Sequence, residues 1–111
     1  MRLRQRWEAL VQLRTGSHSL AEETGRWLRP PQPREARICP HCRQGVEDAA
    51  HMVYDCPLYA PQRQRWHSLF PADEPRLLTV FLAHDPYPLA DFVAACRKQW
   101  ERANAALAAA P

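Results

Sequence analysis

Residues 39–56 read CPHCRQGVEDAAHMVYDC, and within them Cys39, Cys42, His51 and Cys56 form the pattern C-x2-C-x8-H-x4-C. Three thiols and one imidazole complete the tetrahedral ligand set of a zinc ion. Because no position is left for a substrate water, a zinc ion held here would be structural rather than catalytic. The sequence therefore predicts one structural Zn2+ with these four ligands.

Two alternatives to this reading of the stretch remain open. His41 lies between the first two cysteines and could replace a ligand, although a tight C-x2-C turn favours an outward side chain. Cys39-Pro40-His41-Cys42 is also the tetrapeptide of a redox dithiol in thioredoxin-like periplasmic thiol oxidases. That chemistry needs a thiol of lowered pKa at a helix N-terminus that follows a strand. Here Pro-rich residues precede the first thiol, and no βαβ pattern is visible.

The length of 111 residues predicts one domain, which we divide into three parts. Residues 1–30 form two N-terminal helices, residues 36–58 form the zinc knuckle, and residues 57–111 form the C-terminal helices. Eleven prolines and only three glycines suggest helices separated by stiff corners. The predicted fold class is all-α, a small helical domain of five to six helices organised around one CCHC zinc knuckle.

Helical spacing of apolar residues predicts the N-terminal elements. The first helix ends at Thr15-Gly16, and Ser19 with Glu22 forms a capping box that opens a second helix over residues 19–28. The apolar face of the first helix is expected to consist of Leu3, Trp7, Leu10 and Val11.

The elements after Arg37 follow from the same pattern. Asp48 can cap a short helix that carries His51, and a helical segment follows over residues 57–70, with Pro61 as a difficulty near its start. Residues 77–82 form a short helix or a buried strand, and residues 85–88 form a corner. The last helix is expected to place one apolar face along Leu89, Phe92, Val93, Cys96, Trp100, Ala103 and Leu107. A buried core thiol is the favoured reading of Cys96, with a ligand or reactive group as the alternative.

The lack of membrane and secretion signals in the sequence predicts a location inside the cell. No apolar run is long enough to cross a bilayer, and no signal peptide is visible, so we expect an intracellular protein of the nucleus or cytoplasm without a membrane partner.

The net charge is +3, and arginine supplies all but one of the 15 basic residues. This composition is a weak nucleic-acid signature; the alternative is that it reflects the base composition of the gene. The acidic pairs, such as Glu47-Asp48, are expected to lie in caps and loops and to be solvated.

Residues 38–42 and 46–59 resemble the zinc-binding segment at the C-terminal end of reverse transcriptases from non-LTR retrotransposons. That family has a C-x2-C pair, an acidic stretch leading to a histidine, and a Cys-Pro box followed by an Arg-rich helix. Residues 10–20, LVQLRTGSHSL, are similar to a further segment of the family. The resemblance implies zinc ligands at Cys39, Cys42, His51 and Cys56. It also implies a role in holding RNA or DNA beside the polymerase domains, which are themselves expected partners.

The chain departs from that family because it lacks the Asp-Asp catalytic box and is too short for a polymerase. We therefore expect no enzyme and no catalytic residue. Phosphate or base contacts are predicted at Arg37, His41, Arg43, Arg63 and Arg65, with Arg2, Arg4 and Arg6 as a secondary patch and Tyr59 as a stacking residue. The alternative function is a zinc-stabilised scaffold for protein–protein interaction, which exposed tryptophans among Trp7, Trp27, Trp66 and Trp100 would favour.

Overall fold

The computed structural model describes residues 3–16, 20, 28 and 30–109, and this part of the chain is mostly helical and contains no strand. Its only extended pairing is an isolated bridge between Ile38 and Val46. The prediction of an all-α fold is confirmed. The second predicted helix, residues 19–28, lies outside the described residues except for Leu20 and Leu28. The α-helices are α1 (Leu3–Thr15), α3 (Ala60–Arg65), α4 (Leu78–Phe81) and α5 (Pro86–Ala109).

Short turns of other helix types connect these helices. Three are 3-10 turns, namely η2 (Arg34–Ala36), η4 (Pro57–Tyr59) and η5 (His67–Leu69). The fourth, η3 (His51–Asp55), is a π-helical turn. The helical segment predicted over residues 57–70 is thus split into η4, α3 and η5. Pro61 is accommodated because it lies in the first turn of α3, where its missing N–H has no helical partner to lose.

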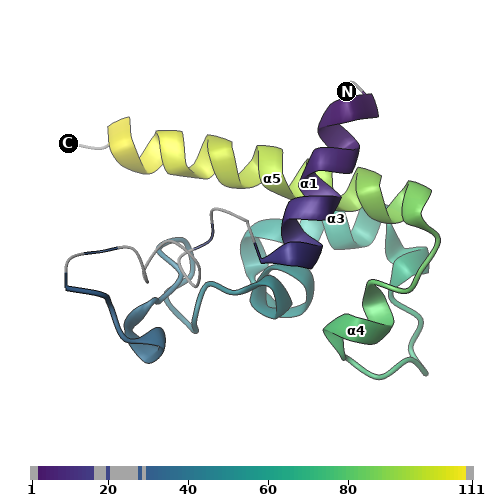
Figure 1. Ribbon diagram of the computed structural model, residues 1–111, viewed down its shortest axis with the longest axis horizontal. Helices are drawn as coiled ribbons and strands as arrows, with labels where there is room; N and C mark the ends of the chain where they lie inside the picture. Colours follow the sequence, from purple (N-terminus) through teal and green to yellow (C-terminus); the bar gives the residue numbers. More distant parts are fainter. Residues whose placement is uncertain (1–2, 17–19, 21–27, 29, 110–111) are drawn as a thin grey trace.

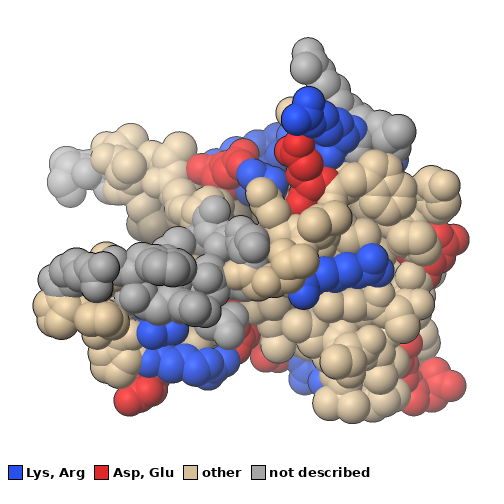
Figure 2. Space-filling view, in the orientation of Figure 1, with Lys and Arg blue, Asp and Glu red and all other residues tan. Residues whose placement is uncertain are grey.

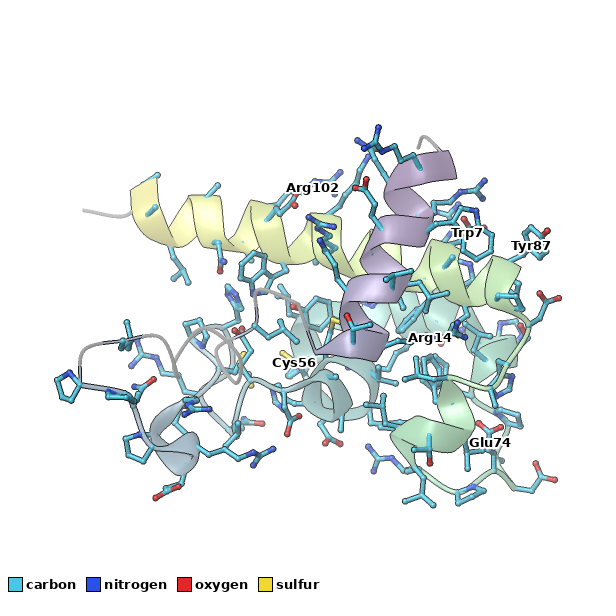
Figure 3. The ribbon with its side chains drawn as sticks, viewed as in Figure 1. Trp7, Arg14, Cys56, Glu74, Tyr87 and Arg102 are labelled. Atoms are coloured by element: carbon cyan, nitrogen blue, oxygen red, sulfur yellow. The ribbon has the colours of Figure 1, made fainter. Side chains whose placement is uncertain are left out.

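Helix α1 packs across α5, and the two form the frame of the molecule (Figure 1). Leu10 and Leu13 bury the inner face of α1, whereas Val11 is 55% exposed, so the predicted apolar face is wrong at Val11 and missed Leu13. Trp7 meets Tyr87 of α5 edge to face, with 5.4 Å between ring centroids (Figure 3). The helix ends at Thr15 as predicted, where Gly16 adopts a left-handed φ of 74°.

Helix α5 begins about one turn earlier than the sequence indicated, at Pro86. The predicted corner at residues 85–88 is its first turn, because Asp85 Oδ1 accepts the N–H of Tyr87 at 3.0 Å and Pro86 takes the first helical position. Cys96 is fully buried in the apolar face, as predicted. Towards its C-terminus the helix extends beyond α1 (Figure 1), and Leu107 on that face is 48% exposed.

An aromatic cluster fills the space between α5, α4 and the turns that follow α3. Phe81 packs against Phe70 and Phe92, with centroids 5.1 and 5.7 Å apart, and Tyr54 meets both Phe70 and Phe81 edge to face. Residues 78–81 are helical, which excludes the strand alternative for this segment. Within the described residues, no helix is both long and apolar enough to cross a membrane.

Candidate metal centre

Cys39, Cys42, His51 and Cys56 come together in one cluster, as the spacing predicted. Their ligand atoms all lie within 4.8 Å of one another. The sulfurs of Cys39 and Cys56 are 3.9 Å apart, and Cys42 Sγ lies 3.2 Å from His51 Nε2. Three of the four side chains are buried and that of Cys42 is partly buried. The four residues could hold one metal ion.

The distances fit a tetrahedral zinc ion. Zinc–sulfur bonds of about 2.3 Å place two sulfurs about 3.8 Å apart, and a zinc–nitrogen bond of about 2.0 Å places sulfur and nitrogen about 3.5 Å apart. The observed separations of 3.9 and 3.2 Å differ from these by a few tenths of an ångström. Other separations in the cluster reach up to 4.8 Å, so binding would draw those ligands together by about 1 Å. The imidazole would bind through Nε2, while its Nδ1 faces Gly45.

A tight turn presents the first two ligands. The carbonyl of Cys39 accepts the N–H of Arg43 at 2.9 Å, which closes the turn, and Cys39 N donates to Gly45 O at 2.8 Å. Backbone N–H groups of Cys42 and His41 donate to the Cys39 sulfur. Arg43 adopts a left-handed φ of 58°, a conformation that costs an L-residue about 1–2 kcal/mol. The knuckle therefore carries backbone strain at Arg43.

The π-helical turn η3 brings the other two ligands to one side. His51 and Cys56 are five residues apart, a separation that in an α-helix would point their side chains about 140° apart. In η3, Cys56 N donates instead to His51 O at 2.8 Å, and the wider turn lets both side chains converge. Asp48 Oδ1 accepts the N–H of His51 at 2.7 Å, so Asp48 caps the start of this helical segment, as predicted.

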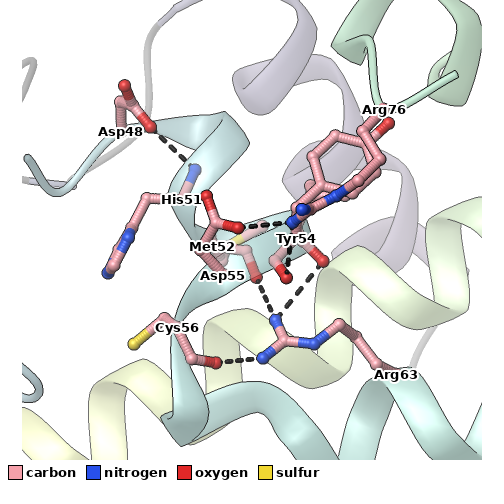
Figure 4. A network of polar contacts seen from close by, with 9 residues as sticks. Asp48, His51, Met52, Tyr54, Asp55, Cys56, Arg63 and Arg76 are labelled. Carbon is pink, nitrogen blue, oxygen red and sulfur yellow. Dashed lines mark hydrogen bonds and ion pairs between the residues drawn. The ribbon is translucent and has the colours of Figure 1, made fainter. Parts of the chain in front are cut away.

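Two arginines hold the end of η3 in place (Figure 4). Arg63 donates to the carbonyls of Met52 at 3.0 Å, Val53 at 3.3 Å, and Cys56. Arg76 donates to Tyr54 O at 3.2 Å and pairs with Asp55. The carbonyls that a helix end leaves unpaired are thus satisfied by guanidinium groups. These interactions position the backbone between His51 and Cys56.

Burial raises the pKa of two of the candidate ligands. The pKa of the Cys56 thiol rises to about 12, chiefly through burial, and the pKa of Cys39 is also raised by burial against the opposing backbone N–H groups. A catalytic or redox thiol needs a lowered pKa. Cys39 also lies in a turn rather than at a helix N-terminus. Both findings argue against the dithiol alternative.

A buried polar group beside the cluster was not foreseen. Glu47 was expected to be solvated, but it is only 4% exposed. Its Oε2 lies 3.7 Å from Cys39 Sγ, accepts from Trp100 Nε1 at 3.3 Å, and is 3.9 Å from His41 Nε2. No sequence pattern predicted this burial, because Glu47 belongs to an acidic pair with Asp48, whose side chain caps a helix.

His41 and Tyr59 do not fit their predicted roles at a nucleic-acid surface. The side chain of His41 is 6% exposed and turns towards Glu47 rather than joining the ligand cluster. Tyr59 is 1% exposed. The predictions of an outward His41 and of an exposed stacking Tyr59 are therefore wrong. The sequence could not show that the knuckle packs against Trp100 of α5.

The predicted arginine contacts divide into two groups. Arg63 is committed to the carbonyls of η3, so its predicted role as a phosphate contact is replaced by a structural one. Arg37 Nε donates to Gln32 O at 2.8 Å, while Arg43 and Arg65 are exposed. In the secondary patch, Arg4 pairs with Glu8 and Arg6 with Asp91, and Arg2 lies outside the described residues.

The tryptophans test the alternative of a protein–protein scaffold. Trp7, Trp66 and Trp100 are each partly buried and pack against the core, and Trp27 lies outside the described residues. The three described rings do not form an exposed cluster. This observation does not favour an aromatic docking surface.

No family model matches the chain, and comparison with curated proteins and with solved structures gave no match. The functional assignment therefore depends on the geometry of the site and on its surroundings.

Proposed function

We propose that the protein is a non-catalytic zinc module that binds RNA or DNA and is related to the C-terminal zinc-binding segment of non-LTR reverse transcriptases. The observation that carries the metal assignment is the Cys3His cluster, whose ligand atoms lie within 4.8 Å of one another. Four protein ligands saturate a tetrahedral zinc ion and leave no position for a substrate water. The ion is accordingly structural, and no catalytic residue is assigned.

The structural role of the ion follows from how few backbone hydrogen bonds hold the knuckle, residues 36–58, together. Within the knuckle, the described backbone hydrogen bonds outside its helical turns are few, among them Cys39 N to Gly45 O at 2.8 Å and Glu47 N to Arg37 O at 2.9 Å. Structural zinc contributes about 10–16 kcal/mol in zinc-finger peptides, comparable with the whole stability of a small domain, about 5–15 kcal/mol. Removal of the metal is expected to unfold at least residues 36–58.

Nucleic-acid binding is supported by the arginine-rich composition and by the resemblance of residues 38–59 to the retroelement segment. Zinc with three thiolates contributes a net charge of −1, so the folded chain keeps a charge of about +2. The polymerase domains of such an element are a further proposed partner. The exposed tryptophan cluster that would favour a general protein scaffold was not found among the described rings.

The test is binding of the zinc-loaded chain to labelled single-stranded RNA and DNA at about 50 mM and about 200 mM salt. Phosphate contacts predict affinity that falls steeply with salt. A chelator-treated sample is the control, because unfolding of residues 36–58 should reduce the helical circular dichroism. Absence of binding to either nucleic acid at the lower salt would remove this function, and an unchanged spectrum after metal removal would remove the structural role of the ion.

A further inference from the structure

An open groove between α3 and α5 collects much of the basic charge of the molecule. It has a volume of about 570 Å³, and α1 contributes one residue to it. The side chains that matter to the argument are Arg6, Arg65, Trp66, Asp91, Lys98 and Arg102. On α5, Asp91, Lys98 and Arg102 are separated by seven and four residues, so that they share one face of the helix. Arg102 lies in the C-terminal half of that helix (Figure 3).

The charge of the groove equals that of the whole chain. Four cations and one carboxylate line it, a net charge of +3, which is the formal charge of all 111 residues. The rest of the chain is therefore neutral overall. On the face shown in Figure 2, basic and acidic side chains lie intermixed without a broad field of one sign. The groove is thus a local concentration of positive charge rather than part of a generally basic surface.

Three of these cations make no ion pair or hydrogen bond within the part of the chain that the structure describes. Arg6 pairs with Asp91 at 2.6 Å. Across the described residues, the only Lys or Arg side chains without an ion pair or a hydrogen bond are Arg43, Arg65, Lys98 and Arg102. Three of the four line this groove. Unpaired cations that face one hollow favour an anionic ligand.

A stacking surface lies beside these cations. The guanidinium of Arg65 lies 4.7 Å from the centroid of the Trp66 ring, and Trp66 meets buried Phe92 edge to face at 6.2 Å. The contact with Phe92 anchors a ring that remains partly exposed. Single-stranded nucleic acids combine phosphate contacts with bases that stack on aromatic rings or on arginine planes. The groove offers both kinds of contact.

The surroundings of the metal site lack these features. Among the described residues, the hollow beside His51 is lined by Asp48 and Asp55, which pair with Arg34 and Arg76, and by no Lys or Arg. The zinc with its three thiolates would add a further negative charge there. His41 and Arg63, two of the predicted contacts near the knuckle, are turned into the protein. The electrostatic balance therefore disfavours the knuckle as the surface that meets phosphate.

We propose that the α3–α5 groove binds a single strand of RNA or DNA, with phosphates on Lys98 and Arg102 and a base stacked on the Arg65–Trp66 pair. This inference rests on the proposed function and moves the contact surface away from the predicted knuckle residues. Two phosphate contacts give a salt exponent of about −1.4 for a single strand. Affinity should then fall about sevenfold between about 50 mM and about 200 mM salt.

The test uses the zinc-loaded full chain and a labelled oligonucleotide of about 20 nucleotides, which is longer than the ~4–16 nucleotides of a typical single-strand site. The groove variant replaces Arg65, Lys98 and Arg102 by glutamine. The control variant replaces Arg4, Arg14 and Arg43 by glutamine, so both variants have the same net charge. All six residues are exposed, and circular dichroism establishes that both variants fold.

The groove variant should lose roughly tenfold in affinity for each cation removed at about 50 mM salt, and its salt dependence should flatten. The control variant should bind within about threefold of the original chain and keep its salt exponent. R65K keeps the charge but not the planar group, so it should weaken binding and leave the salt exponent unchanged.

The outcomes separate this inference from the proposed function. If the original chain binds neither RNA nor DNA, the proposed function fails. If it binds, but the groove and control variants weaken binding equally, the groove assignment alone is overturned. Equal affinity for polyglutamate and for the oligonucleotide would also overturn it, because polyglutamate offers neither phosphates nor bases.

Discussion

Replacement of Arg63 by methionine should destabilise the zinc-loaded protein by about 3 kcal/mol. Arg63 donates to Met52 O at 3.0 Å, to Val53 O at 3.3 Å, and to Cys56 O, the carbonyls that end η3. Each bond from a charged donor contributes about 1.5–3 kcal/mol, and a buried carbonyl left without a donor costs about 1–3 kcal/mol. Part of this gain is offset by the burial of the guanidinium, which also lowers the pKa of Arg63. A net loss near the cost of one or two such bonds follows.

The matched control is R65M, two residues further along α3. Arg65 is exposed, and its only described interaction is with the ring of Trp66 at 4.7 Å, which is worth about 0.5–1 kcal/mol. Urea unfolding followed by circular dichroism gives the free energy of unfolding of each variant, and competition with a chelator gives the zinc affinity. R63M should lower both, because Arg63 positions the backbone between His51 and Cys56. Equal losses in R63M and R65M would refute the structural role of Arg63.

Three further predictions concern the ligands and the knuckle. In the metal-free chain the thiols of Cys39 and Cys56 are protonated near neutral pH, because even an exposed thiol has a pKa of about 8.5, so zinc must displace at least two protons. Chelator competition should then show affinity falling about a hundredfold for each unit of decreasing pH, and a flat affinity between pH 6 and 8 would contradict the assignment of these thiols. R43G should be about 1 kcal/mol more stable than R43A in thermal unfolding, because glycine adopts the left-handed φ of 58° without strain. If R43A is the more stable variant, the backbone at Arg43 is not strained. D48A should lose about 1 kcal/mol of stability in the same assay, because Asp48 caps the helical segment before η3. D48N should lose less, because it keeps an acceptor for the N–H of His51. Equal losses in D48A and D48N would show that the ion pair with Arg34 matters instead.

The ligand set of the metal centre could be predicted because spacing and residue type constrain it. A C-x2-C turn followed by a histidine and a cysteine has few arrangements in which all four atoms converge. The π-helical form of η3 could not be predicted, because the sequence only shows that two ligands are five residues apart. The same residues are compatible with an α-helix. Only the requirement that His51 and Cys56 reach one metal ion distinguishes the α-helix from the π-helical turn.

The frame of α1 and α5 also follows from apolar spacing, with errors that have a common physical cause. Val11 and Leu107 carry apolar side chains at helical intervals, but both are about half exposed. Periodicity identifies a face that can be buried, whereas burial depends on what packs there. The same limit applies in reverse to Glu47 and His41, which become buried because α5 brings Trp100 onto the knuckle.

The proposed contact surface for RNA or DNA was the least predictable feature. The sequence directed attention to arginines near the knuckle, and among these Arg63 proved to hold the backbone of η3. Arg65 and Arg102 are 37 residues apart in the sequence but line the same groove. Such a surface depends on how α3 packs against α5, which no local pattern specifies.

The central claim is that one zinc ion is bound by three sulfurs and one imidazole nitrogen. X-ray absorption at the zinc edge of the purified chain, with the metal content measured on the same sample, tests it most directly. We predict one zinc per chain with three sulfurs at about 2.3 Å and one nitrogen at about 2.0 Å. A chain without bound metal, or a zinc shell that contains oxygen in place of a sulfur or of the imidazole nitrogen, would contradict the account.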